Sequence, residues 1–340
     1  MTSGDAAAIE RRPMEVSLDD VIAAGERLRE LVAHTPLLSS DAIDEAASGR
    51  RVLLKCENLQ RTGSFKVRGA LNALLQMSPD ELRQGVMTAS SGNFGLGLAW
   101  ASKLLGARAS IVMPSDAGTL KRRAAESLGA TVHLCAPTLA DRERVKAKVA
   151  RSTKAVYVSP HDDARVIAGQ GTVAVEMVDE ASAPASVLVP VGGGGLLAGI
   201  AIALKGLWPG VRVVGVQPTG AGDAARSKAA GRLIAEDAPQ SVARGLLVNL
   251  GVKTWPIVDA LVDDVVVVDD AEIVDAMRLI WESAKLVVEP SAAVTVAALA
   301  SPELRGRLGD GAAIAVLSGG NVDLDDLPWK QLQPSAVGTA

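Results

Sequence analysis

The chain has 340 residues, 48% hydrophobic and 22% charged, and its 35 Lys and Arg against 39 Asp and Glu give a formal net charge of −4. This composition is typical of a globular protein of one large or two ordinary domains, and it excludes a disordered chain. No basic block occurs, which argues against a nucleic-acid partner. The two cysteines, Cys56 and Cys135, lack metal-type spacing and are expected to be buried, reduced thiols.

The N-terminal segment carries no targeting signal that we recognise. Residues 1 to about 17 are polar and charged, without the apolar centre of a signal peptide, and we expect a disordered leader there. Gly, Pro or charged residues interrupt every apolar stretch well short of a membrane span. We therefore expect a cytoplasmic protein that has no membrane partner.

The predicted elements alternate between strands and helices. Ser17 caps a first helix, whose apolar residues recur at helical spacing from Val21 to Val32. From Val52 onward, short β-branched runs alternate with amphipathic helices, which predicts a doubly wound, parallel α/β fold. Between residues 85 and 159 the expected strands are 86–89, 109–113, 131–134 and 155–158, and the expected helices are 94–105, 120–128 and 140–149.

A longer series of elements follows Pro160. Strands are expected at 186–191, 211–216, 265–268 and 312–317, and helices at 166–180, 196–207 and within 271–300. We therefore predict a small domain of residues 85–159, inserted in a large domain of residues 1–84 and 160–340. A cleft between two such domains is the natural ligand site.

A lysine lies at a predicted strand-to-helix junction, in the stretch Gly63-Ser64-Phe65-Lys66-Val67-Arg68-Gly69-Ala70. Gly63 is expected to form a turn and Ser64 to cap the helix. The helix dipole at this end should lower the proton affinity of the amine, which helps a lysine that must be neutral to attack a carbonyl. A solvated surface lysine is the alternative, and the apolar Phe65 argues against it.

Three further junctions carry polar or glycine-rich motifs. Ser90-Ser91-Gly92-Asn93-Phe94-Gly95 can offer amides and hydroxyls to a carboxylate, or form an ordinary capping turn. Gly192-Gly193-Gly194-Gly195-Leu196 lets successive amides converge on a phosphate. A dinucleotide site fits less well, because the strand 211–216 ends at Gln217 rather than at an acid. Ser318, in Leu317-Ser318-Gly319-Gly320-Asn321, ends the last strand and should face the cleft.

Together these motifs resemble those of the serine/threonine dehydratase and serine racemase family of pyridoxal-phosphate enzymes, over about residues 21–327. The resemblance implies a tryptophan synthase β-like architecture, fold type II, with the cofactor in the cleft between two doubly wound parallel sheets. It implies that Lys66 holds pyridoxal 5'-phosphate as a Schiff base. The other implied cofactor residues are Phe65 and Gly245 at the ring faces, Asn93 at the phenolic oxygen, Gly192, Gly193, Gly194, Gly195 and Leu196 at the phosphate, and Ser318 at the pyridine nitrogen.

The resemblance also implies substrate residues and a metal site. Ser90, Ser91, Gly92 and Asn93 would hold the substrate carboxylate, and Arg142 would lie near its side chain, although a solvent-facing helix arginine is an equal alternative. Relatives with a divalent metal have ligands spaced like Gln217, Ala221 and Asp223. Here a glutamine replaces an acid, so we expect weakened Mg²⁺ or Ca²⁺ affinity, with Asp223 as the remaining acidic ligand.

The activity that the resemblance implies is elimination of water from a 3-hydroxy amino acid of the L-threonine or L-serine type, giving a 2-oxo acid and ammonia. Lys66 would take the Cα proton, and a serine at the pyridine nitrogen suits elimination better than transamination. A racemase is the alternative, because Ser91 stands where racemases have a second proton shuttle. Intact Lys66 argues against a non-catalytic binding protein. We expect a homodimer or homotetramer.

Overall fold

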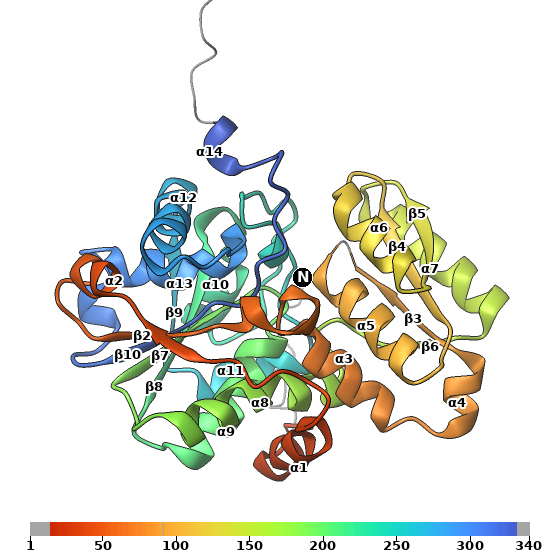
Figure 1. Ribbon diagram of the computed structural model, residues 1–340, viewed down its shortest axis with the longest axis horizontal. Helices are drawn as coiled ribbons and strands as arrows, with labels where there is room; N and C mark the ends of the chain where they lie inside the picture. Colours follow the sequence, from red (N-terminus) through yellow and green to blue (C-terminus); the bar gives the residue numbers. More distant parts are fainter. Residues whose placement is uncertain (1–13, 91, 332–340) are drawn as a thin grey trace, which may run out of the picture.

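The computed structural model describes residues 14–90 and 92–331, and these form two lobes, each around a sheet (Figure 1). The six-stranded sheet has the order β1-β2-β10-β7-β8-β9, and the four-stranded sheet has the order β5-β4-β3-β6. The strands are β1 (Leu37–Ser39), β2 (Val52–Lys55), β3 (Val86–Ala89), β4 (Ala109–Pro114), β5 (Thr131–Cys135), β6 (Val156–Tyr157), β7 (Ser186–Pro190), β8 (Arg212–Pro218), β9 (Asp264–Val268) and β10 (Ala313–Val316).

The helices connect these strands as the alternating pattern predicts. They are α1 (Leu18–Leu28), α2 (Asp41–Ala46), α3 (Lys66–Leu75), α4 (Pro79–Gln84), α5 (Asn93–Leu104), α6 (Thr119–Ser127), α7 (Leu139–Thr153), α8 (Ala164–Glu180), α9 (Gly195–Leu207), α10 (Asp223–Ala230), α11 (Thr254–Leu261), α12 (Asp270–Leu279), α13 (Pro290–Ala300) and α14 (Pro328–Gln331). A π-helical turn, Ile280–Ala284, continues α12, and the short 3-10 turns η1 (Glu57–Leu59) and η2 (Arg61–Gly63) precede α3.

Both faces of the six-stranded sheet are buried. Ile314 and Val316 of β10 face a core that α1, α8, α9 and α11 complete, whereas Ala313 and Ala315 face a core completed by α2, α12 and α13. A strand buried on both faces reads as a continuous apolar run, which is the pattern of residues 312–317. Neighbouring strands are parallel except β1, which pairs antiparallel with β2 and was not predicted, because three residues after Pro36 are too few to show alternation.

The four-stranded sheet is parallel throughout and is also covered on both faces. Val86 and Ile111 face a core with α3, α5 and α6, and Met87 and Val112 face α7. The first of these cores also includes Leu71 of α3. That residue precedes residue 85 and belongs to the predicted large domain. The division at residues 85 and 159 therefore stays a proposal.

The prediction of a disordered leader up to about residue 17 is wrong at its C-terminal end. Residues 1–13 lie outside the described residues, but Val16 is buried in a core and Ser17 forms a capping box with Asp20 at the start of α1. Cys56 and Cys135 are buried free thiols, as predicted, and burial raises the pKa of Cys56 to about 12. Within residues 14–90 and 92–331, no helix has both the length and the hydropathy that crossing a bilayer would need.

Candidate active site

Lys66 is the first residue of α3, and two residues separate it from the turn η2. The expectation that Ser64 caps this helix is wrong, because the cap position is Phe65, whose backbone is already helical (φ −54°, ψ −21°). Ser64 instead pairs with Gly319 in an isolated antiparallel bridge, and its buried hydroxyl has no hydrogen-bond partner among the described residues. This bridge joins the lysine segment to the end of the last strand.

The Lys66 amine lies in apolar surroundings. Its Nζ donates a hydrogen bond to the Pro160 carbonyl at 3.2 Å and lies 4.8 Å from the centre of the Phe65 ring and 6.0 Å from that of Phe94. Burial lowers the pKa of Lys66 to about 8, and the charge of Glu289 partly opposes this shift. A lowered pKa was expected from the sequence, where we attributed it to the helix dipole. The larger cause in the structure is the removal of water from around the amine.

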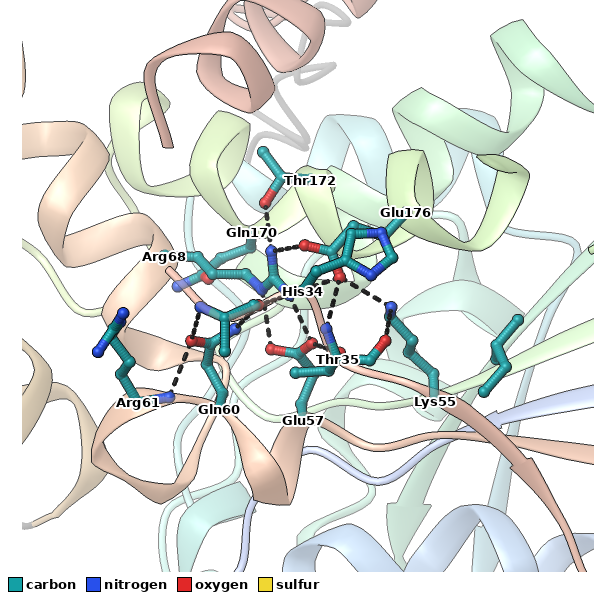
Figure 2. A network of polar contacts seen from close by, with 12 residues as sticks. His34, Thr35, Lys55, Glu57, Gln60, Arg61, Arg68, Gln170, Thr172 and Glu176 are labelled. Atoms are coloured by element: carbon teal, nitrogen blue, oxygen red, sulfur yellow. Dashed lines mark hydrogen bonds and ion pairs between the residues drawn. The ribbon is translucent and has the colours of Figure 1, made fainter. Parts of the chain in front are cut away.

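A network of buried charges anchors α3 through Arg68 (Figure 2). Arg68 Nη2 lies 2.8 Å from Glu57 Oε1 and Arg68 Nη1 lies 2.6 Å from Glu176 Oε1 on α8, while Lys55 Nζ of β2 lies 2.8 Å from Glu176 Oε2. Burial alone would lower the pKa of Arg68, but Glu57 and Glu176 raise it above its ordinary value. The network thus joins β2, α3 and α8 two residues from Lys66.

The four glycines form the crossing from β7 to α9. The Gly193 carbonyl accepts hydrogen bonds from the Gly251 N–H at 3.2 Å and from the Thr254 hydroxyl at 2.8 Å. Gly194 has φ +87°, and a Cβ there would lie 2.8 Å from both Leu250 and Thr254. The loop therefore needs glycine for its conformation and its packing, and it leads with Leu196 into a helix N-terminus, which favours an anion.

His161 is a site residue that the sequence reasoning missed. A Cβ added to Gly193 would overlap the His161 ring, and Pro160, the residue before it, accepts the bond from Lys66. Burial and the charge of Lys66 lower the pKa of His161 to about 4, so that the ring is neutral at pH 7. The sequence did contain a signal for this residue. His161 is one of only three histidines in the chain, and it follows the predicted strand 155–158 closely.

The residues predicted to hold the substrate carboxylate lie beside an ion pair that was not predicted. Gly92 caps α5 and its N–H donates to Ser90 Oγ at 3.3 Å. Lys121 Nζ lies 3.3 Å from Glu289 Oε2, and a Cβ on Gly92 would lie 3.5 Å from Lys121 Nζ. The amides at the start of α5 can bind a carboxylate, and the cation beside them, Lys121, is paired with Glu289. Ser91 lies outside the described residues.

Asn93 lies among side chains from distant segments. Its Nδ2 donates to Glu289 Oε1 at 2.5 Å, and its Oδ1 accepts from Asn321 Nδ2 at 3.1 Å. Ser318, three residues before Asn321, accepts a hydrogen bond at its carbonyl from the Phe65 N–H at 3.1 Å. The structure thus brings Asn93 and Ser318 to the segment that bears Lys66.

Three predicted site residues remain, namely Gly245, Arg142 and Asp223. Gly245 donates to Ser291 Oγ at 3.0 Å, and the next residue, Leu246, lies against Gly192, so Gly245 borders the glycine loop. Arg142 lies on α7 and is half-buried, and its charge makes the smallest of the contributions that lower the pKa of His161, so its place near the substrate stays a prediction. Asp223 is bonded to Gln217 and to the backbone of Leu250, and it belongs to a separate cluster.

These residues fit pyridoxal phosphate. The glycine loop offers amides at a helix N-terminus for the phosphate, and a lysine with a lowered pKa of about 8 lies nearby. The buried hydroxyl of Ser64, two residues before Lys66, has no hydrogen-bond partner among the described residues and could bind a polar group of a ligand. The two sheets and this combination of residues define a fold-type-II pyridoxal-phosphate enzyme.

Comparison with known proteins gives the same result. The family model "Pyridoxal-phosphate dependent enzyme" matches residues 28–320. The beta-hydroxyaspartate dehydratase of Paracoccus denitrificans (strain Pd 1222) is 42% identical over 314 residues, 92% of this chain and 98% of that protein. The serine racemase of Homo sapiens is 42% identical over 326 residues, 92% of this chain and 94% of that protein. The solved threonine deaminase of T.th. is 41% identical with a TM-score of 0.85, covering 91% of this chain and 99% of that one.

The chain belongs to the pyridoxal-phosphate-dependent family that includes serine racemase, hydroxyaspartate dehydratase and threonine deaminase. The predicted fold class, family and cofactor are confirmed. The family comprises both dehydratases and racemases, so membership alone leaves the reaction of this chain to be argued from its residues.

Proposed function

We propose that the protein removes water from a 3-hydroxy amino acid of the L-threonine or L-serine type, giving a 2-oxo acid and ammonia. The observation that carries the proposal is the Lys66 amine, whose pKa of about 8 keeps it available as a base, beside a phosphate-type glycine loop. The dehydratase and the threonine deaminase among the relatives support the same reaction class.

The cofactor would be held by this chain's loops and rings. The amides of residues 192–196 would bind the phosphate, Asn93 the phenolic oxygen and Ser318 the ring nitrogen, with Phe65 and Gly245 at the ring faces. When bound, pyridoxal phosphate withdraws electrons from the Cα of the amino acid joined to it. A hydroxyl partner such as Ser318 leaves the ring nitrogen less protonated than a carboxylate would, which suits elimination of a β-substituent.

Lys66 supplies the base. An amine with a pKa of about 8 is neutral in about one molecule in ten at pH 7, far more often than an exposed lysine. Its Nζ takes the Cα proton, the Cβ–O bond breaks, and the hydroxyl leaves as water with a proton equivalent to the one removed from Cα. The released enamine is hydrolysed to the 2-oxo acid and ammonia, which balances the atoms of the reaction.

The substituent on Cβ would face the Arg142 side of the site. Arg142 is a cation whose charge acts on the neutral imidazole of His161, and the second cation, Lys121, is paired with Glu289. A second carboxylate on the substrate would be attracted to such a region, and the Paracoccus relative is named for a substrate that has one. 3-Hydroxyaspartate therefore belongs in the substrate panel beside serine and threonine.

Racemisation is the second candidate. It is favoured by the 42% identity to human serine racemase and by the hydroxyl of Ser91 in the substrate loop. Racemisation needs a proton donor on the face opposite Lys66, whereas elimination from an L-substrate needs only Lys66 and a protonated leaving group.

The deciding experiment follows oxo-acid release and chirality together. The holoenzyme is assayed on L-serine, L-threonine, D-serine and 3-hydroxyaspartate, with 2-oxo acid measured by absorbance and isomers by chiral chromatography. We expect oxo-acid release to exceed D-isomer formation, and Ser91→Ala to reduce D-isomer formation and D-serine turnover more than L-dehydration. Faster interconversion of L- and D-serine than pyruvate release would replace the dehydratase with the isomerase.

A further inference from the structure

Gln217 and Asp223 form a closed hydrogen-bonded pair in the interior. Gln217, near the end of β8, donates through Nε2 to Asp223 Oδ1 at 2.9 Å, and both side chains are buried. Gln217 Oε1 accepts from the N–H groups of Ala224 and Ala225, at 3.0 and 3.1 Å, which fixes the orientation of the amide. Asp223 Oδ2 accepts from the Leu250 N–H at 2.8 Å. Each carboxylate oxygen of Asp223 therefore already accepts a hydrogen bond from the protein.

This arrangement does not fit a divalent cation. Mg²⁺ and Ca²⁺ require several oxygen ligands directed at one point, but the group that faces Asp223 is an NH₂, which only donates. Across residues 14–90 and 92–331, no three Asp, Glu, His or Cys side chains come together as a metal cluster would require. The glutamine takes the place where a metal-binding relative would have an acid.

The pair is connected to the phosphate-type loop. Asp223 holds the backbone of Leu250, and the next residue, Gly251, donates to the Gly193 carbonyl at 3.2 Å. The Leu250 side chain also packs at Gly194, where an added Cβ would lie 2.8 Å from it. A shift of Asp223 would thus be passed to the glycine loop through two consecutive residues.

We propose that the Gln217–Asp223 pair is a metal-independent brace of the cofactor-phosphate loop. The side-chain amide cross-links the end of β8, the first turn of α10 and the segment 250–251, which is the mechanical role that a bound cation would have at this position. Gln217 and Asp223 are positioning residues, because they act on the cofactor through Leu250 and Gly251. Stability and cofactor affinity should therefore not depend on Mg²⁺ or Ca²⁺.

The first test uses the parent protein. The apoprotein and holoenzyme are treated with EDTA and then titrated with MgCl₂ or CaCl₂, while the melting temperature and the pyridoxal-phosphate dissociation constant are measured. We expect neither quantity to change. A rise in melting temperature of about 4 °C or more at millimolar cation, the size that specific binding produces, would overturn the proposal.

The second test restores the acid. In Gln217→Glu two carboxylates face each other, so we expect a lower melting temperature in EDTA that Mg²⁺ or Ca²⁺ raises again. Gln170→Glu is the matched control, because Gln170 is also fully buried and its Oε1 accepts from the Gly69 N–H at 3.2 Å, away from Asp223. This control should be destabilised without cation rescue. Failure of cations to rescue Gln217→Glu would show that the amide does not occupy an ion's place.

A third variant tests the brace without adding a charge. Asp223→Asn keeps the size of the side chain but removes the charged acceptor of the Leu250 N–H. We expect pyridoxal phosphate to bind about tenfold more weakly, the usual effect of losing a charge-assisted hydrogen bond, with a smaller change in the melting temperature of the apoprotein. An unchanged dissociation constant would contradict the link from Asp223 to the glycine loop.

Discussion

At the scale of single residues, the chemistry depends on what surrounds the Lys66 amine. The rings of Phe65 and Phe94 and the Pro160 carbonyl replace water around it, and the pKa falls from 10.5 to about 8. That difference corresponds to about 3 kcal/mol of unfavourable free energy for the charged form in the folded apoprotein. The surroundings that favour the neutral amine therefore lower the free energy of unfolding of the apoprotein.

Lys66→Met should stabilise the apoprotein, because it removes a half-buried cation whose amine lies in apolar surroundings. Below pH 8 the lysine is charged in both folded and unfolded states, so the parent carries the full penalty of about 3 kcal/mol. Because the folded pKa is the lower one, the penalty disappears as the pH rises from about 8 to 10.5, and the variant's advantage should shrink over that range. Urea unfolding of both apoproteins measures this, with the exposed Lys103→Met as control; a variant less stable than the parent at pH 7 would contradict it.

At the scale of elements, the buried charge network determines where α3 begins relative to β2 and α8. Lys55, Glu57 and Arg68 are almost fully buried, and Glu176 is 13% exposed. Two cations face two carboxylates, and Arg68 is bonded to both acids, so no charge of the four is left without a partner of opposite sign (Figure 2). Such a network adds little net stability over an apolar core, but losing one member is costly.

Glu57→Gln should destabilise the protein by about 3–5 kcal/mol, because it leaves the buried Arg68 with a single anion. Glu180→Gln is the matched control, since Glu180 lies 3.7 Å from Lys55 Nζ at the more exposed rim, where a pair contributes about 1 kcal/mol or less. Free energies of unfolding from urea titration at pH 7 compare the two. Equal losses would show that the inner acid has no special role.

At the scale of the whole molecule, the site depends on how the two lobes meet. Lys66 comes from α3, which packs against α5 of the four-stranded lobe, and α5 carries Asn93 at its first turn. The helices touch at Gly97, where a Cβ would lie 3.0 Å from the Val67 backbone nitrogen. The domain boundaries, the cytoplasmic location and the homodimer or homotetramer remain predictions at this scale.

Gly97→Ala should push α5 away from α3 and so separate Asn93 from Lys66. We expect a loss of stability of about 1–3 kcal/mol and a weaker binding of pyridoxal phosphate. Gly95→Ala, on the same helix, would meet the Ile111 side chain at 3.1 Å instead, within the four-stranded lobe. Cofactor titration of both variants should show the larger loss for Gly97→Ala; equal affinities would contradict a role for the spacing of these two helices.

Features that depend on neighbours along the chain were predictable from the residues alone. They include the alternation of strands and helices, the glycine crossing at 192–195 and the lysine at the start of α3, because turn glycines and apolar periodicity act over a few residues. The three-residue β1 was too short for a periodic signal. The N-cap of α3 was wrongly predicted at Ser64. The cap is Phe65, which makes no side-chain capping hydrogen bond and has helical backbone angles, so no capping residue type marks it in the sequence.

Contacts between distant residues, by contrast, were set by the packing of the folded chain. The contacts of His161 with Gly193 and of Glu289 with Asn93 join segments far apart in the sequence, which no local pattern records, and so does the burial that lowers the pKa of Lys66. The same holds for Gln217, where the residues show a lost acid but only the fold shows an amide bonded to Asp223. Burial and the direction of a hydrogen bond are properties of the packed chain, and they determine whether a residue type becomes a base, a brace or a ligand.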